Sequence, residues 1–160
     1  MYFEIYQIKD IENCKYAFMS YDFAEKVGGV NITDYKRVAW GNGKGIFNTL
    51  DDIYEYFNLT PPETYKGRSV SVSDLICIDD EDWYYVDDFG FKHLGSFEMQ
   101  TFNGQEFRIC SICGSVMIDG FATPCGFMHY CSEECLHEDY TPDEYQKAYE
   151  ADECFYTEWY

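Results

Sequence analysis

The stretch Cys110-Ser111-Ile112-Cys113-Gly114, answered by Tyr130-Cys131-Ser132-Glu133-Glu134-Cys135, decides how the chain is organised. A C-x2-C pair followed by glycine turns a tight knuckle that directs both thiolates at one metal ion, and a second pair completes a tetrahedron. Four thiolates suit Zn²⁺, which they hold at about 2.3 Å, whereas Ca²⁺ and Mg²⁺ require oxygen ligands. The pattern predicts one structural zinc ion, closed to catalytic water, on Cys110, Cys113, Cys131 and Cys135.

The second cysteine pair also has the local sequence of a helix start. Ser132 is a favoured N-cap residue, the two glutamates after it suit the positive end of a helix dipole, and Cys135 falls in the first turn. A knuckle followed by a helix-borne pair is similar to the treble-clef type of zinc module. Other residues near the loop could replace one ligand, namely Cys125, His129 and His137. Four unconnected buried cysteines or two disulfides are the remaining interpretations, which a cytosolic setting disfavours.

The length of 160 residues allows one good core and a small satellite. The opening residues 1–7 alternate like a strand and lack the basic start and apolar core of a signal peptide, and no apolar run approaches the roughly 18 residues of a membrane span. We therefore expect a cytoplasmic protein without membrane contact. In that compartment Cys14, Cys77 and Cys154 are expected to be reduced and partly buried.

The charge balance is strongly acidic, with 30 acidic and 11 basic residues and a formal net charge of −19. Such a surface repels nucleic acid. Aromatic residues make up 20% of the chain, far too much ring surface for a disordered acidic tail. An acidic, folded, tyrosine-rich surface suits a basic protein partner, and most basic surfaces in a cell are built to hold nucleic acid.

The first part of the chain has the pattern of an α+β domain. Residues 2–8 are apolar on both faces of a strand, which predicts an interior strand covered on each side. Ser20 and Thr49 are expected to cap helices over residues 21–27 and 50–57. Further strands are expected at residues 35–40, 75–78, 83–86 and 89–91, so the fold class is α+β with a small mixed sheet and packed helices.

Four segments of this part resemble the YodL-like domain family of Firmicutes over about residues 1–95. They are Phe18–Asp22, Thr49–Tyr54, Gly67–Asp74 and Tyr84–Phe91. Proteins of that family frequently sit on plasmids, conjugative elements and phages. The resemblance therefore implies a mobile element in a bacterial host cell, and it supplies no reaction.

The second part begins with a linker over residues 97–107, which leads into the knuckle. Thr141-Pro142-Asp143-Glu144 predicts a helix running to about Asp152, with Tyr145, Ala148 and Tyr149 as its buried stripe. The last rings, those of Phe155, Tyr156, Trp159 and Tyr160, are expected to fold back on the zinc module. We expect a YodL-like domain at residues 1–96 and a four-cysteine zinc-binding module with an acidic C-terminal helix at residues 97–160.

The motifs favour a binding protein and no enzyme. No histidine, serine or cysteine stands in a nucleophile or acid–base pattern, with His93 following a strand and His129 and His137 flanking the second cysteine pair. A DNA-reading zinc finger needs lysines and arginines, and residues 109–160 contain only Lys147. We expect a counter-defence inhibitor, anti-CRISPR or anti-restriction, that mimics nucleic-acid charge and blocks a nuclease. The alternative is a zinc-stabilised adaptor or regulator in mobile-element maintenance.

Two acidic segments are candidates for the surface that meets the basic partner. Residues 133–160 hold ten acidic residues and one lysine, a balance of −9. Residues 79–82 form an acidic turn that lacks the glycine hinge and closing glutamate of a calcium loop, which indicates a solvated hairpin tip. The candidate contact residues are Asp143, Glu144, Glu150 and Asp152 in the first segment and Asp79, Asp80, Glu81 and Asp82 in the second. A solvated surface that only confers solubility is the simpler interpretation of both.

Overall fold

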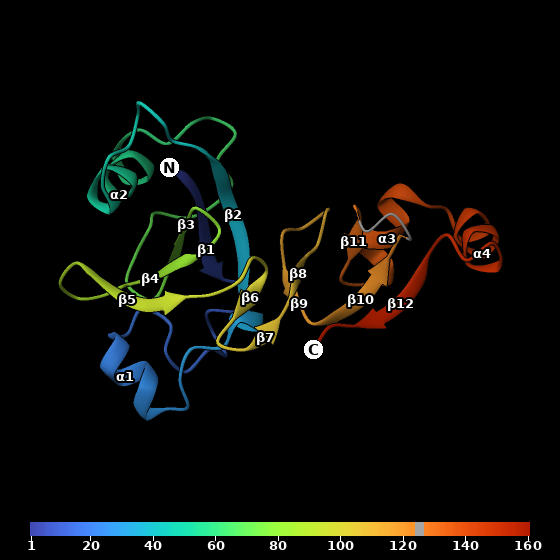
Figure 1. The fold of residues 1–160 in the computed structure, drawn as a ribbon, viewed down its shortest axis with the longest axis horizontal. Helices are drawn as coiled ribbons and strands as arrows, with labels where there is room; N and C mark the ends of the chain where they lie inside the picture. The colour runs from blue at the N-terminus through green and yellow to red at the C-terminus, as the bar shows by residue number, and fades with distance from the viewer. Residues whose placement is uncertain (124–126) are drawn as a thin grey trace. The chain divides into compact units, whose positions relative to one another are not determined.

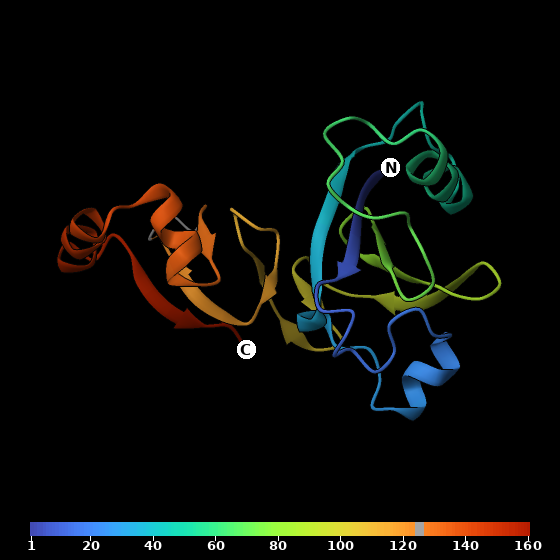
Figure 2. The same cartoon turned by 180° about the vertical axis from the view of Figure 1, so that it is seen from behind.

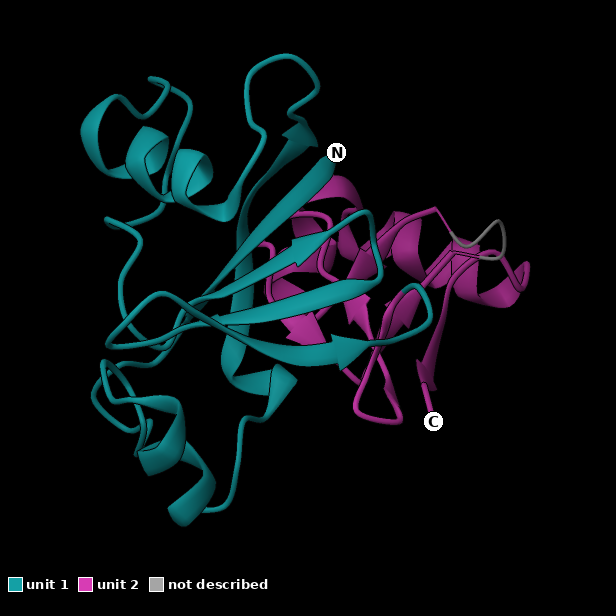
Figure 3. Cartoon of the chain, turned by 60° about the vertical axis from the view of Figure 1, so that its left-hand side comes forward, with its two compact units in different colours: residues 1–99 teal, residues 100–160 magenta. Residues whose placement is uncertain are grey.

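The chain folds into two compact units, residues 1–99 and residues 100–160 (Figure 3). The computed structural model describes residues 1–123 and 127–160, so that Cys125, an alternative ligand in the sequence analysis, lies outside the described residues. The boundary expected from the sequence lies between residues 96 and 97.

The first unit is built on a five-stranded sheet in the order β2-β1-β3-β4-β5 (Figure 1). Its strands are β1 Tyr2–Ile8, β2 Tyr35–Asn42, β3 Leu75–Ile78, β4 Asp82–Val86 and β5 Phe91–Ser96. Each neighbouring pair is antiparallel, because short hairpins join β3 to β4 and β4 to β5 and β1 runs against both of its neighbours. The sheet that we expected to be mixed is therefore antiparallel at all of its pairings, within a confirmed α+β fold.

The prediction of an interior strand at the N-terminus is confirmed. β1 lies between β2 and β3 and is buried from Phe3 to Ile8. One covered face carries Phe3 and Ile5, packed with Ile53 and Phe57 of a helix. The other face carries Tyr6, whose ring centroid lies 4.9 Å from that of Trp83.

The helices of the first unit lie on opposite sides of the sheet (Figures 1 and 2). α1 spans Tyr21–Lys26, with the Ser20 side chain accepting a hydrogen bond from the backbone of Phe23. A short 3₁₀ turn, η1, spans Ile32–Asp34. α2 spans Leu50–Leu59 and begins with a complete capping box between Thr49 and Asp52. Both predicted helix starts are confirmed.

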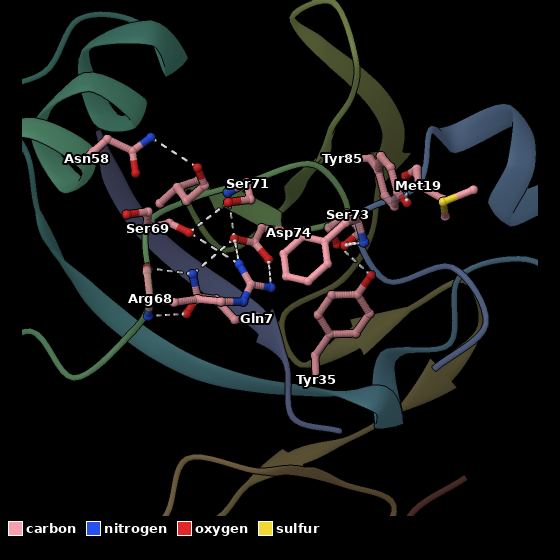
Figure 4. A network of polar contacts seen from close by, with 12 residues as sticks. Gln7, Met19, Tyr35, Asn58, Arg68, Ser69, Ser71, Ser73, Asp74 and Tyr85 are labelled. Carbon is pink, nitrogen blue, oxygen red and sulfur yellow. Dashed lines mark hydrogen bonds and ion pairs between the residues drawn. The ribbon is translucent and has the colours of Figure 1, made fainter. Parts of the chain in front are cut away.

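The segment Gly67–Asp74, which carries part of the family resemblance, ties the loop before β3 to β1 and β2 (Figure 4). Asp74 is fully buried, and its carboxylate accepts hydrogen bonds from Arg68 Nη1 at 2.8 Å and Nη2 at 2.5 Å. Gln7 Nε2, at 3.0 Å, and the backbone N–H of Ser71, at 2.9 Å, donate to the same carboxylate. At the preceding residue of the chain, the Ser73 carbonyl accepts a hydrogen bond from the Tyr35 hydroxyl at 2.8 Å. These hydrogen bonds, centred on the buried Asp74 carboxylate, form a polar tie between the loop and the sheet.

In its described residues, 100–123 and 127–160, the second unit contains three small sheets and two helices. Its strands are β6 Thr101–Phe102, β7 Gln105–Glu106, β8 Arg108–Ile109, β9 Val116–Met117, β10 Asp119–Ala122, β11 His129–Tyr130 and β12 Phe155–Glu158, and its helices are α3 Glu133–Asp139 and α4 Pro142–Glu150. β6 pairs with β7, β8 pairs with β9, and the third sheet has the order β11-β10-β12. The capping box of α4 joins Thr141 and Glu144 as predicted, and the helix ends at Glu150.

Two segments of the second unit differ from the sequence-based expectation. The expected linker over residues 97–107 contains the β6–β7 hairpin, whose turn residues Asn103 and Gly104 have φ values of 48° and 82°. Asn-Gly favours a hairpin turn of this left-handed type, so the prediction of an unstructured linker was wrong for these residues. The final aromatic segment is strand β12, because it completes the sheet beside β10.

Exposure corrects two further expectations. Tyr149, expected in the buried stripe of α4, is 55% exposed, whereas Ala148 is buried. Of the final rings, Phe155, Tyr156 and Tyr160 are exposed, and Trp159 packs edge-on against His129 at 5.5 Å. Phe155 and Tyr156 are consecutive in β12 and point to opposite faces of its sheet, and neither face covers its ring fully.

His93, expected just after a strand, lies inside β5. Among the residues that the structure describes, no helix has the length and apolar character needed to cross a bilayer.

Candidate metal centre

The first cysteine pair lies on a knuckle at the tip of the β8–β9 hairpin. The chain turns back because the Gly114 N–H donates to the Cys110 carbonyl at 3.0 Å and the Cys110 N–H donates to the Ser115 carbonyl at 2.9 Å. Gly114 has a φ of 77°, a left-handed conformation that glycine adopts without strain. The glycine after the second cysteine therefore makes the knuckle possible.

The second cysteine pair lies where β11 passes into α3. Cys131 follows β11, and Cys135 is in the first turn of α3, where its backbone N–H donates to the Ser132 side chain at 3.3 Å. The knuckle is fastened to β11 by two hydrogen bonds, from the Ser111 N–H to the His129 carbonyl at 2.8 Å and from the His129 N–H to Ser111 Oγ at 3.1 Å. A knuckle, a hairpin and a helix-borne pair together form a treble-clef-like arrangement.

The four sulfur atoms converge at the spacing of a metal site. Cys110, Cys113, Cys131 and Cys135 place their Sγ atoms within 4.8 Å of one another. The Sγ atoms of Cys113 and Cys131 are 3.5 Å apart, and those of Cys131 and Cys135 are 3.8 Å apart. Four sulfurs around one ion at about 2.3 Å stand about 3.8 Å from one another, whereas a disulfide needs about 2.05 Å. The four cysteines therefore could hold a single metal ion.

The thiols of this cluster differ in acidity. Burial acts to raise the pKa of Cys113, but hydrogen bonding with the Ser115 side chain and backbone outweighs it and lowers the pKa to about 7. Burial raises the pKa of Cys135 to about 11, and burial together with Cys113 raises the pKa of Cys131 well above its usual range. Metal coordination deprotonates thiols, so uptake of a divalent ion releases protons.

The alternative histidine ligands lie outside the cluster. His137 Nδ1 is 2.9 Å from the Tyr140 carbonyl, and the His129 ring packs against Trp159. Within residues 1–123 and 127–160, the one group of three or more cysteine, histidine or acidic side chains placed to share an ion is the four-cysteine cluster. The sequence analysis missed Ser115, whose hydroxyl lies 3.2 Å from Cys113 Sγ, because no spacing rule identifies a hydroxyl beside a ligand.

The core around the cluster is small. Its buried residues are Tyr130, Leu136, Ala148 and Cys154, which join β11, α3, α4 and the segment before β12. The Tyr130 hydroxyl donates to Asp139 Oδ2 at 2.8 Å and so ties β11 to the end of α3. A unit of about sixty residues is marginal without a metal or a disulfide.

Some of the acidic candidate residues accept hydrogen bonds within the described part of the fold, and the others do not. Asp143, Glu144, Glu150 and Asp152 are all exposed, but Glu144 accepts hydrogen bonds from the Thr141 N–H and hydroxyl in the capping box. In the β3–β4 turn, Asp79 accepts from the Tyr2 N–H at 2.6 Å, and Asp82 accepts from the Ser96 hydroxyl. Asp80 is partly buried and Glu81 is exposed. Several of these acids therefore also support the local fold.

Comparison with known proteins identifies one family. The family described as the YodL-like domain matches residues 2–97. Neither the curated proteins nor the solved structures contain a significant match to the chain. The four cysteines follow the matched segment, as does the whole of α3 and α4. Since the match spans more than half of the 160 residues, the chain belongs to the YodL-like domain family and carries a four-cysteine module after that domain.

Proposed function

We propose that the protein is a non-enzymatic binding factor of a phage or mobile element that presents a zinc-stabilised acidic surface to a basic protein partner. The partner class is a nuclease complex whose basic channel holds nucleic acid. The protein occupies that channel by charge mimicry and so acts as a counter-defence inhibitor, anti-CRISPR or anti-restriction. The setting is the cytoplasm of a bacterial host cell, and the protein itself does not bind nucleic acid.

The observation that supports this proposal is the state of the carboxylates in residues 133–160. All ten are exposed, and the described part of the chain offers none of them an ion-pair partner. With Lys147 as the single cation, the segment keeps a balance of −9. Unpaired exposed carboxylates retain their field for a partner and steer a basic surface toward it. Exposed rings of Tyr149, Phe155 and Tyr156 in the same segment offer contact area once the partner is bound.

Zinc is the ion that the donor set favours. Four thiolates are soft ligands, and tetrahedral sulfur sites select zinc or iron–sulfur centres over hard cations. Closed four-cysteine coordination leaves no position for a reacting water, so the role of the ion is structural. It holds the knuckle against α3 and thereby presents the acidic segment that follows.

Metal analysis of the purified protein tests the zinc site. We expect one zinc per chain, and Cys113→Ser is expected to lose it and to unfold the second unit, because structural zinc in finger peptides contributes about 10–16 kcal/mol of folding free energy. Cys14→Ser, at a partly exposed cysteine outside the cluster, is the matched control and keeps the metal. Full zinc content in Cys113→Ser refutes the four-cysteine site. Iron, with its visible absorption, in place of zinc refutes the choice of ion.

Capture from a bacterial lysate on the immobilised protein tests the binding function. Retained proteins are washed at about 0.1 M and then 1 M salt, over which the Debye length falls from about 10 Å to 3 Å, and a duplicate column is washed with duplex DNA. We expect to retain a nucleic-acid-binding nuclease that is released by the 1 M salt wash and, on the duplicate column, by the duplex DNA. A partner that resists salt and DNA refutes mimicry and favours the alternative, an adaptor or regulator in element maintenance.

Neutral variants then locate the surface. Asp143→Asn with Glu150→Gln and Asp152→Asn removes three exposed carboxylates without touching the capping box of α4. Asp80→Asn with Glu81→Gln removes two carboxylates at the β3–β4 turn, one partly buried and one exposed, and spares the two acids that accept hydrogen bonds from a backbone N–H or a hydroxyl. We expect the first set to slow association and the second to leave it unchanged. The reverse result moves the contact to the first unit.

A further inference from the structure

We propose that the open edge of β2, with the apolar pocket beside it, binds an extended apolar peptide segment of a partner protein by strand addition. This surface belongs to the first unit and shares no residue with the acidic segment or the metal centre. It would recognise the side chains of a peptide, in addition to the charge-based contact of the proposed function. The inference stands or falls independently of the charge-mimicry proposal.

β2 is an edge strand with an unused side. It is the first strand in the order β2-β1-β3-β4-β5, and across the described residues it pairs with β1 alone. An edge presents outward N–H and C=O groups that an added strand can satisfy. The first half of β2 carries Lys36 and Arg37, the kind of charge that protects an edge, whereas Ala39–Asn42 carries no charge.

The geometry of β2 singles out that second half. The pairing with β1 shifts between Ile5 and Tyr6, which face Ala39 and Arg37, so Val38 is an extra residue at a bulge. Beyond the bulge, four consecutive pairs run regularly from Ile5↔Ala39 to Tyr2↔Asn42. A stretch of this length accommodates a short added strand in register.

A pocket of about 420 Å³ opens along this stretch. Five consecutive β2 residues, 38–42, line it, although side chains of one face would contribute only alternate residues. The pocket therefore reaches the strand's edge and is not confined to one face. Its other walls come from β1, the turn after β2, α2 and the loop after α2, through Phe3, Ile46, Phe47, Tyr56, Phe57, Pro62, Thr64 and Tyr65.

The chemistry of the pocket specifies an apolar occupant. None of its lining residues is charged, in a chain where 26% of residues are charged. At its rim the large apolar side chain of Ile46 stays 63% exposed. The Arg37 guanidinium lies 4.2 Å from the centroid of the Trp40 ring in a cation–π contact. An ion pair of 2.6 Å with Glu4 fixes the position of that guanidinium. Trp40 pairs with Glu4, so its ring lies on the face of β2 opposite Phe3 and the pocket. There the ring, 57% exposed, offers an apolar surface to the side chains of an added strand that point away from the pocket.

An extended peptide matches both features at once. Its main chain satisfies the outward groups of residues 39–42, and its alternate side chains point toward and away from the pocket. The volume accommodates one large aromatic side chain or two aliphatic ones. A compact small molecule fills the pocket but leaves the strand edge unpaired, and a basic segment finds no carboxylate on the pocket wall.

Phage display of random dodecapeptides against the immobilised full-length protein supplies the probe, and the enriched peptide is synthesised with a fluorescent label. Anisotropy then compares wild type, Gly41→Val and Ile46→Ala. A Cβ at Gly41 meets its nearest atom, in the Phe3 ring, at an ordinary 3.7 Å, so a side chain can begin there without a clash, and the larger valine takes up space beside the pocket. Ile46 is mostly exposed, so its truncation leaves folding intact. Phe89→Ala, at a 98% exposed ring remote in sequence from the pocket, is the control for general stickiness.

We expect Kd to rise by about tenfold or more in Gly41→Val and by several-fold in Ile46→Ala, with Phe89→Ala within about twofold of wild type. Amide hydrogen exchange of the full-length protein gives the second readout. Strand addition slows exchange at alternate residues within 39–42, which side-chain insertion alone does not. Failure to enrich any apolar peptide, equal binding by Gly41→Val, or unchanged exchange in β2 each overturns the proposal. Slowed exchange together with lost binding in Gly41→Val supports it.

Discussion

Replacing Asp74 with alanine removes the acceptor at the centre of the polar tie shown in Figure 4. The change leaves the Arg68 guanidinium without its ion pair, and the Ser71 N–H and one Gln7 donor hydrogen lose an acceptor. Breaking a buried pair on one side costs about 3–5 kcal/mol. The Arg68 side chain keeps 25% of its surface exposed, so water compensates part of the loss, and we expect the low end, about 3 kcal/mol. For a unit of this size that lowers Tm by roughly 12–24 °C.

Urea unfolding followed by tryptophan fluorescence measures this change, because Trp83 in the first unit is only 2% exposed. Asp74→Asn keeps the shape and one acceptor and is expected to fall between wild type and alanine. Asp88→Ala, at an exposed acid of the β4–β5 turn, controls for the loss of negative charge and is expected to leave the midpoint unchanged. If Asp74→Ala unfolds at the same urea concentration as Asp88→Ala, the polar tie does not hold the first unit together.

Three further predictions concern the second unit. A strong chelator is expected to unfold the second unit, whereas a reductant alone is expected to leave it folded, because the described cysteines form no disulfide. Near-ultraviolet circular dichroism measures both effects. Loss of the signal with reductant alone contradicts the prediction. Leu136→Ala, at a fully buried site of the small core, is expected to cost about 2–5 kcal/mol in thermal unfolding of the zinc-loaded protein, and a Tm like that of wild type contradicts the assigned core. Gly120→Ala is expected to destabilise by about 1–3 kcal/mol, since its φ is 155° and its Cβ meets the Tyr130 carbonyl at 2.5 Å; an unchanged denaturant midpoint argues against that close approach.

Local chemistry made much of this structure predictable. The capping boxes at Thr49 and Thr141 are short-range patterns, and both begin helices where expected. The cysteine spacing likewise predicted which four sulfurs converge, because a knuckle and a helix turn are themselves local structures. The same reasoning placed the five main strands of the first unit within a few residues.

What the sequence did not reveal depends on distant partners. Strand β12 exists because β10 accepts it across more than thirty residues, and its aromatic residues had no local sign of that pairing. Tyr149 is exposed because the small core is already filled by Ala148 and its neighbours. The β6–β7 hairpin was the avoidable error, since Asn103-Gly104 is a recognised turn signal.

The uncharged half of β2 also makes each molecule a template for another. Two copies that meet edge to edge at residues 39–42 would extend one sheet across both, and the apolar rim would favour their contact. At neutral pH a formal charge of −19 on every copy opposes that approach. The opposition weakens as the pH falls toward the isoelectric point near 4.2 or as salt rises. The negative charge of this chain therefore also prevents copies from pairing through the open edge of β2. Acidification is the condition under which the protein is expected to self-associate through that edge.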